Sequence, residues 1–363
     1  MAVPEMISVE DRSTSLMQRT GAIPRRIQTT LMGQHGVQTM DDEAHYHRKD
    51  LFMSVMTPGS LHRFQRLLID SWQAYLGRWE NLDEVVLLTE TEQVLCRAAC
   101  AWAGLPFEEK DIQPLARDLA LMIDAFGGVG PRHARGKAAR SRAEKWTRSF
   151  IEQVRAGQLS PPDDRPLTAV AWHRDLNGQL LSPQMAAVEL LNLVRPIIAI
   201  GRFIAFMALA LHEHPEYVPR LQAGSDLYRE MFVQEVRRYY PFTPLVGALA
   251  RKNFEWRGHQ FKKGTMVLLD VYGMLHDARQ WPEPEQFRPE RFRDWNGSAF
   301  NFLPQGGGPY DTGHRCAGEW LTIEALKIAL NFLVSGLRYE LPPQDLSYDL
   351  TRMPTAPASG VLL

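Results

Sequence analysis

The chain has 363 residues, a length that suits one large domain or two ordinary ones. Hydrophobic residues make up 45% and charged residues 23%, as in a soluble globular enzyme, and the net charge of -1 gives no field that favours nucleic acid or an anionic membrane. Three cysteines exclude a dense disulfide framework and favour a reducing, cytoplasmic compartment, and the first fifteen residues contain no apolar signal-peptide core.

Most of the first 240 residues have a pattern typical of helices. Cys96 and Cys100 lie four residues apart on one face of an expected helix, and without further ligands nearby they are interpreted as small buried residues. Residues 130–148 are strongly basic, which is typical of a solvated helix face. The polar, proline-rich stretch "LSPPDDRPLT" (159–168) indicates a loop between helices.

A long apolar helix is expected after Ser182, which suits the N-cap, and Pro183, which suits the first helical position. Its central stretch "ELLNLVRPIIAIGRFIAF" contains Arg195 and Pro196 side by side. Proline removes a helical hydrogen bond, and a guanidinium group that cannot lose its proton needs an anion when it is buried. These polar interruptions argue against a membrane span and raise the question of which anion Arg195 meets.

The pattern changes after Pro241. The stretch "FEWRGHQFKKGTMVLLD" (254–270) alternates between apolar and polar residues and contains two glycine-centred turns, so it predicts short strands. Helical spacing returns in "AGEWLTIEALKIALNFLV", and the last residues have an extended pattern. The sequence therefore predicts a mainly α protein with a minor β part.

The strongest chemical signal is "FNFLPQGGGPYDTGHRCAGEWLTIEAL", in which a glycine-rich loop leads to Cys316 and then to an amphipathic helix. A cysteine at a helix N-terminus has a stabilised thiolate, which serves as a nucleophile or a metal ligand; an inert buried cysteine is the alternative. Upstream, "EVRR" places Glu235 and Arg238 at the spacing of a helical ion pair, and "FRPERF" adds Arg291.

In this order and spacing the motifs resemble the cytochrome P450 superfamily, from about residue 33 to the end. The resemblance implies a cytochrome P450 fold in a single haem-thiolate domain over residues 1–363. Cys316 would be the axial ligand of the iron of haem b, and Glu235, Arg238 and Arg291 would pair behind the haem. Members of the family usually begin several dozen residues earlier, so we expect the chain to be short at its N-terminus.

Two departures from the usual family pattern narrow the resemblance. Pro309 and Thr312 stand where the cysteine loop usually has phenylalanine and glycine. Arg195 and Pro196 stand where monooxygenases of the family carry an acid–alcohol pair that delivers protons. Both departures are similar to the bacterial fatty-acid peroxygenases, as are the stretches "LVRPIIAI", "FVQEVRRYYPF" and "GVQTMDDEAHYHRK".

That branch implies hydroxylation of long-chain fatty acids at the alpha or beta carbon with hydrogen peroxide, without a redox partner protein, nucleic acid or membrane insertion. The substrate carboxylate would pair with Arg195 and shuttle the proton, and Pro196 would kink the helix to make room for it. Gln38 would face the beta carbon and favour hydroxylation, with decarboxylation to a terminal alkene as a minor reaction. A plain loop glutamine is the alternative for Gln38.

The resemblance also implies that His45 contacts a haem propionate, with further contacts from Lys49, Tyr240 and Arg315. Phe242 would line the channel near the substrate carboxylate, and a plain core phenylalanine is the alternative. Two other functions stay open. One is a reductase-dependent fatty-acid monooxygenase, which the missing acid–alcohol pair disfavours, and the other is a haem-containing binding or sensing protein without turnover.

Overall fold

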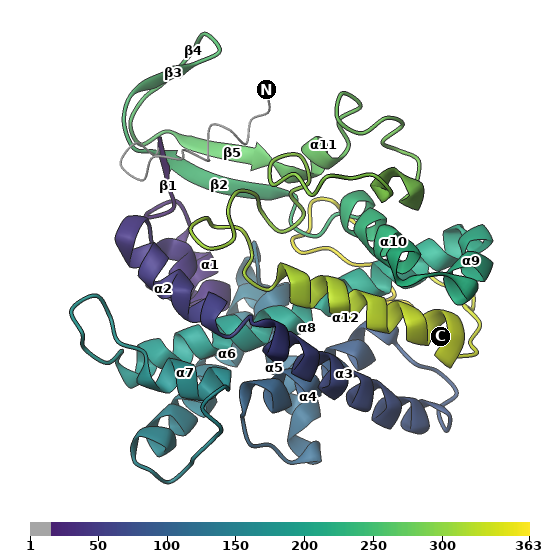
Figure 1. Cartoon of the computed structure of the whole chain (residues 1–363), viewed down its shortest axis with the longest axis horizontal. Helices are drawn as coiled ribbons and strands as arrows, with labels where there is room; N and C mark the ends of the chain where they lie inside the picture. The colour runs from purple at the N-terminus through teal and green to yellow at the C-terminus, as the bar shows by residue number, and fades with distance from the viewer. Residues whose placement is uncertain (1–15) are drawn as a thin grey trace.

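The computed structural model describes residues 16–363, so the interpretation of the first fifteen residues lies outside the described part. Helices fill most of the molecule, and the strands gather at one side of it, at the top of Figure 1. The predicted fold class, mainly α with a minor β part, is confirmed.

The helices of the N-terminal part lead from short turns to the long central helix α8. They are α1 (Arg25–Ile27), η2 (Gln28–Met32), η3 (Val37–Thr39), α2 (Asp42–Ser54), α3 (Pro58–Trp79), α4 (Leu87–Ala103), α5 (Glu109–Asp124), α6 (Gly130–Arg155), α7 (Pro166–Trp172) and α8 (Pro183–Glu213). The later ones are η4 (Pro215–Tyr217), α9 (Val218–Ala223), α10 (Asp226–Tyr239), α11 (Val271–Leu275), η5 (Pro289–Phe292), α12 (Glu319–Asn331) and η6 (Phe332–Gly336).

The strands form two small antiparallel sheets. One has the order β1-β2-β5, with β1 (Met17–Gln18), β2 (Leu245–Ala250) and β5 (Met266–Asp270). The other is the hairpin of β3 (Phe254–Trp256) and β4 (His259–Phe261). The strands predicted over residues 254–270 are therefore present, and β2 joins the N-terminal strand to β5.

Helix α8 is the core of the molecule and packs against α4, α6 and α12. The Ser182 side chain accepts a hydrogen bond from the Met185 amide at 3.1 Å, and Pro183 follows, which confirms the predicted start. The helix continues unbroken through Pro196. Its length and composition would suit a membrane span, but 94% of its most apolar window is buried inside the protein, as in the core helix of a soluble protein.

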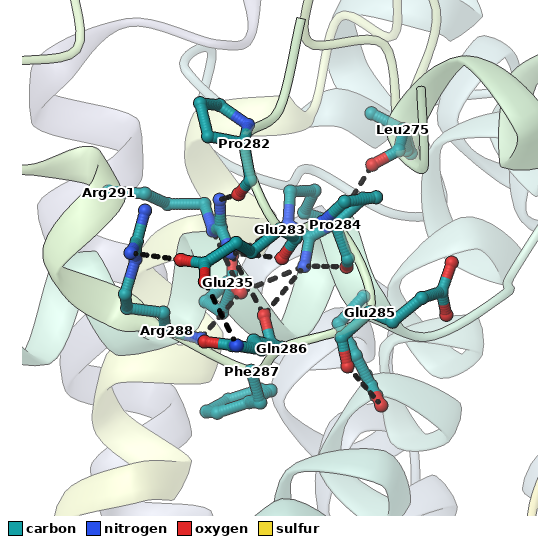
Figure 2. Close-up of polar contacts among 12 residues, drawn as sticks. Glu235, Leu275, Pro282, Glu283, Pro284, Glu285, Gln286, Phe287, Arg288 and Arg291 are labelled. Atoms are coloured by element: carbon teal, nitrogen blue, oxygen red, sulfur yellow. Dashed lines mark hydrogen bonds and ion pairs between the residues drawn. The ribbon is translucent and has the colours of Figure 1, made fainter. Parts of the chain in front are cut away.

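A buried ion-pair network ties α10 to the segment that precedes and includes η5 (Figure 2). Arg238 approaches Glu235 with two nitrogens, at 2.8 and 2.9 Å, and Arg291 Nε lies 3.0 Å from the same carboxylate. The two guanidinium groups also donate to backbone carbonyls, those of Leu275, Pro282, Glu283, Pro284 and Gln286. The predicted pairing of Glu235, Arg238 and Arg291 is confirmed.

A second buried ion pair joins α4 to α8. Arg202 Nη1 lies 3.2 Å from Glu92 Oε1, and both residues are buried. Burial raises the pKa of Glu92 to about 7, although Arg202 opposes the shift. Folding therefore makes protonation of the Glu92 carboxylate easier than in the unfolded chain.

We predict that Glu235→Ala lowers the free energy of unfolding by about 3–5 kcal/mol, because it leaves two buried guanidinium groups without their anion. Urea denaturation followed by circular dichroism measures this loss. Arg279→Ala, which removes an exposed ion pair with Asp277, is the control and should leave the midpoint unchanged. An equal effect of both substitutions would show that the buried network is not a main source of stability.

We predict that the Glu92→Gln variant has a flatter stability–pH profile than the wild type. The pKa of Glu92 is about 7 in the folded protein and 4.5 ordinarily, so the folded state holds the proton more tightly. The contribution of Glu92 to the free energy of unfolding is then largest below pH 4.5 and decreases by about 3 kcal/mol as the pH rises to about 7. Urea titrations of both proteins across this range measure the difference, and parallel profiles would contradict the shift.

Candidate active site

Cys316 stands immediately before α12, at the end of the glycine-rich loop. Its backbone N–H donates to the Gln305 carbonyl at 3.0 Å, and the Gln305 side-chain amide lies 3.6 Å from the sulfur. Gly306 has a φ of 91°, and a Cβ there would stand 3.3 Å from the Arg315 Cα. Glycine is therefore required where the two arms of the loop meet, and this contact fixes the position of the thiol.

The surroundings of Cys316 suit a metal ligand better than a free nucleophile. Burial raises the pKa of the Cys316 thiol, while the Gly318 amide, Lys49 and Arg237 favour the thiolate. A coordinated metal ion would supply the positive charge that deprotonates such a thiol. No group of three or more His, Cys, Asp or Glu side chains within residues 16–363 is arranged to hold a metal ion, so a metal bound by Cys316 would need its other ligands from a prosthetic group.

Lys49 brings a buried positive charge to the cysteine loop. Its ammonium group donates to the carbonyl of Gly313 at 3.1 Å and to that of Arg315, and no carboxylate of the described residues forms an ion pair with it. Burial lowers the pKa of Lys49, and the negative charge of Cys316 opposes this shift. Since an ammonium group has three donors, Lys49 can still bind one carboxylate oxygen beside the loop.

His45 lies one turn before Lys49 on α2, with its ring 4.0 Å from the ring of His314. Burial, His314 and Lys49 lower the pKa of His45 to about 3, so the ring is neutral at neutral pH. His314 in turn lies 3.7 Å from a carboxylate oxygen of Asp41. His45 and Lys49 thus meet the cysteine loop from the same side.

Two other residues predicted to contact a propionate have partners of their own. Arg315 Nε lies 2.7 Å from Glu319, with its guanidinium 3.9 Å from the centre of the Tyr310 ring. Tyr240 donates its hydroxyl to Glu213 at 2.9 Å and stacks on Phe206. The propionate contact predicted for Arg315 stays a prediction, because this residue lies in the cysteine loop next to Cys316. The contact predicted for Tyr240 likewise stays a prediction; its hydroxyl donates to Glu213 at the end of α8.

Arg195 is the unpaired cation that the sequence suggested. It is 7% exposed, and in the described part of the chain it has neither a hydrogen-bond partner nor an ion-pair partner. Burial and the charge of Arg140 lower the pKa of Arg195 to about 9, while Cys316 opposes this, so Arg195 and Cys316 lie within electrostatic range of each other. The group remains a cation at neutral pH.

Gln38 and Phe242 lie beside α8. The side-chain oxygen of Gln38, in η3, is buried and has no partner among the described residues. The ring of Phe242 stacks on Phe203 of α8 at 4.7 Å. The structure thus places both residues beside this helix, and the roles predicted for them stay predictions.

Arg140 is an exception to the predicted solvated face of the basic run, in which Arg135, Lys137, Arg142 and Lys145 are exposed. It is 3% exposed, donates to the Leu31 carbonyl at 2.6 Å and pairs with Glu144, and its Nη2 has no partner. Burial lowers the pKa of Arg140. Charge patterning along one helix could not reveal this side chain, because its carbonyl partner lies 109 residues away in η2.

A buried carboxylate on α8 was not predicted from the sequence. Glu189 is fully buried and pairs with Arg48 of α2 at 2.6 Å. Asn192, also buried, donates to it at 3.1 Å. Glu189, Asn192 and Arg195 follow each other at intervals of three residues in an apolar stretch, a signal that could have identified them.

Comparisons with known proteins agree with this arrangement. A cytochrome P450 family model matches residues 226–357. A structure of cytochrome P450SP alpha with (R)-ibuprophen is 44% identical, with a TM-score of 0.95, over 99% of this chain and 87% of that one. A variant of cytochrome P450 OleT with arachidonic acid is 38% identical, with a TM-score of 0.94, over 99% and 85%. Cytochrome P450EX alpha with myristic acid is 40% identical, with a TM-score of 0.91, over 96% and 84%.

Curated relatives match a shorter part of the chain. Cytochrome P450 3A14 of Cavia porcellus is 30% identical over 156 residues, which is 38% of this chain and 30% of that protein. Cytochrome P450 3A16 of Mus musculus is 29% identical over 175 residues, or 42% of this chain and 35% of its own length. The chain thus spans about a third of the length of these relatives.

The cofactor implied by these similarities is a haem, iron protoporphyrin IX, and the residues present fit it. Cys316 offers one sulfur ligand without protein co-ligands, as an iron held in a porphyrin requires. Lys49 offers a free N–H for a propionate, beside the neutral ring of His45. With near-complete structural matches at 38–44% identity and the cysteine loop in place, the chain belongs to the cytochrome P450 family.

Proposed function

We propose that this enzyme hydroxylates long-chain fatty acids at the alpha or beta carbon, or both, with hydrogen peroxide as the oxidant. The observation that carries the proposal is Arg195, a buried cation that has neither a hydrogen-bond nor an ion-pair partner among the described residues and whose pKa, lowered by burial, is raised in part by the charge of Cys316. The acids in the structures of cytochromes P450 OleT and P450EX alpha support a fatty-acid substrate. A reductase-dependent fatty-acid monooxygenase is the alternative.

Arg195 binds the carboxylate of the substrate. A guanidinium group and a carboxylate form two parallel charge-assisted hydrogen bonds, which is the pairing that a buried, unpartnered arginine lacks. The carboxylate thereby compensates the desolvation of Arg195 and anchors the acid at its polar end. The alkyl chain then extends along apolar side chains, with Phe242 as part of the wall.

The anchored carboxylate also moves a proton. The haem, bound through the Cys316 thiolate, supplies the oxidising chemistry, and thiolate ligation favours cleavage of the O–O bond. The carboxylate takes a proton from hydrogen peroxide and returns it to the oxygen that leaves as water, so that one C–H bond becomes C–OH. Arg195 keeps its own protons because its pKa stays at about 9.

The position of the carboxylate decides which carbon reacts. With the acid held at Arg195, the alpha and beta carbons are the ones nearest the carboxylate, and Gln38 faces the beta carbon and favours hydroxylation over decarboxylation to a terminal alkene. Pro196 has no N–H for the carbonyl of Asn192, four residues earlier, which loosens the helix beside the anchor. His45, Lys49 and Arg315 hold the haem propionates.

The remaining features follow from the same chemistry. Peroxide already carries both the oxygen atom and the oxidising equivalents, so no redox partner protein is required. We place the enzyme in the cytoplasm, where its three cysteines, all free, stay reduced. A single haem-thiolate domain over residues 1–363 is the organisation that we propose.

The decisive experiment incubates the haem-loaded protein with myristic acid and hydrogen peroxide, without a reductase, and analyses the products by gas chromatography–mass spectrometry. We expect alpha- or beta-hydroxymyristate with little tridecene. Product that forms only after a reductase and NADPH are added would support the monooxygenase. A spectral response to the acid without product under either condition would support a binding or sensing protein.

We predict that Arg195→Ala keeps the haem and the thiolate spectrum but lowers peroxide-driven hydroxylation by about 10²–10⁴-fold, the usual contribution of acid–base catalysis. The substitution removes the group that holds the proton-carrying carboxylate. Product formation from myristate at a fixed peroxide concentration measures the loss. Hydroxylation at the wild-type rate would refute the carboxylate shuttle.

We predict that Cys316→Ser abolishes the red-shifted Soret band of the ferrous carbonyl complex, because an alcohol replaces the thiolate ligand. Optical spectra of the reduced protein under carbon monoxide test this. Cys100→Ser, which changes a buried cysteine on α4, is the matched control and should keep the band. Loss of the band in both variants would indicate general damage to the fold.

A further inference from the structure

Glu189 connects three elements beside Arg195. One carboxylate oxygen accepts a hydrogen bond from Arg48 of α2 at 2.6 Å and from the backbone N–H of Val37 in η3 at 3.1 Å. The other oxygen accepts from the side-chain amide of Asn192 at 3.1 Å. Because Glu189 is fully buried, these donors take the place of water around its charge.

The contact with Val37 fixes the segment that carries Gln38. Val37 immediately precedes Gln38, and the chain lies so close to α8 here that a Cβ on Gly36 would stand 2.9 Å from the Asn192 amide nitrogen. The same Cβ would stand 3.4 Å from the side-chain oxygen of Gln38. The amide groups of Gln38 and Asn192 therefore lie near each other, and Glu189 binds the backbone N–H of Val37, the residue before Gln38, and the side chain of Asn192.

Glu189 also determines which way the Asn192 amide faces. A carboxylate can only accept, so the NH2 group of Asn192 turns toward Glu189 and its oxygen turns away. That oxygen is buried and has no partner within residues 16–363. Arg195, three residues further along α8, likewise has a buried Nε without a partner.

We propose that Glu189 is a positioning residue, which sets the placement of Gln38 and the orientation of Asn192 next to Arg195 and thereby selects the carbon that is oxidised. This inference depends on the function proposed above, because selection among carbons requires that the acid is anchored at Arg195. Glu189 itself does not touch the substrate. It acts through Val37 and Asn192, while Arg48 balances its charge.

The substitution Glu189→Gln tests this directly. Glutamine offers one acceptor oxygen where Arg48, Val37 and Asn192 now share two, and its NH2 group would face the NH2 group of Asn192. Rotation of the Asn192 amide relieves that clash and presents a donor instead of an acceptor on the Arg195 side. We expect the alpha-to-beta product ratio from myristate to change by about fivefold, as for one hydrogen bond of about 1 kcal/mol.

Two further readouts separate positioning from general damage. The dissociation constant of myristate, measured from the spectral shift of the haem-loaded protein, should stay unchanged because Arg195 is intact. Amide hydrogen exchange in residues 33–40 should become faster, because an uncharged amide oxygen is a weaker acceptor for the Val37 N–H than the carboxylate that it replaces. The double variant Arg48→Gln, Glu189→Gln removes both charges together, so no lone buried charge endangers folding, and it should show the same change in product ratio.

Glu92→Gln is the matched control. It replaces another buried glutamate that pairs with an arginine, in this case Arg202 of α8. It should leave the product ratio and the exchange of residues 33–40 unchanged. Equal shifts in both single variants, or faster exchange at Glu189→Gln with an unchanged product ratio, would overturn the proposal. If the wild type forms no hydroxy acid, the proposed function fails rather than the positioning role. In that case hydrogen exchange still tests the positioning role, and unchanged exchange of residues 33–40 in Glu189→Gln would overturn it.

Discussion

The structure depends on how helix α8 accommodates charge inside an apolar core. Burial of an ion costs several kcal/mol even after the protein relaxes, so a charged residue in this helix needs a partner. Glu189 has Arg48 and Arg202 has Glu92, whereas Arg195 has no anion among the described residues. In the function proposed above, the missing anion is a bound fatty-acid carboxylate, which would stabilise the helix that holds Arg195.

The side of Cys316 shows a different arrangement, because each of two buried carboxylates behind it is bound by two arginines. Glu319, in the first turn of α12, accepts from both Arg237 and Arg315, and Glu235 is surrounded by Arg238, Arg291 and the Arg288 amide. These pairs fix α10, η5 and the start of α12 relative to one another. A rigid frame behind the cysteine and unsatisfied polar groups near Arg195 are what a haem enzyme requires, since the ligand must stay in place while the substrate enters and leaves.

Local chemistry made part of this arrangement predictable from the sequence. Ser182 and Pro183 mark the start of α8, the glycine-rich loop marks Cys316, and the arginine–proline pair marks Arg195, because each signal acts within a few residues. The partners of Glu189 and Arg140 could not be predicted, since they lie 141 and 109 residues away and depend on how α2, η2 and α6 pack. The partner of the Tyr240 hydroxyl could not be predicted either, because Glu213 lies 27 residues away at the end of α8.

Helical geometry explains how the buried ion pair and the substrate anchor can influence each other without contact. Each step of three residues along an α-helix advances about 4.5 Å along the axis and rotates the direction of the side chain backwards by about 60° around that axis. Glu189 therefore faces α2 and η3, Arg195 lies within range of Cys316, and Asn192 lies between them. The side-chain amide of Asn192 has Glu189 as its hydrogen-bond partner among the described residues. In the inference proposed above, a fully buried ion pair thereby takes part in the selectivity of the site, although it lies on the other side of Asn192 from the substrate anchor.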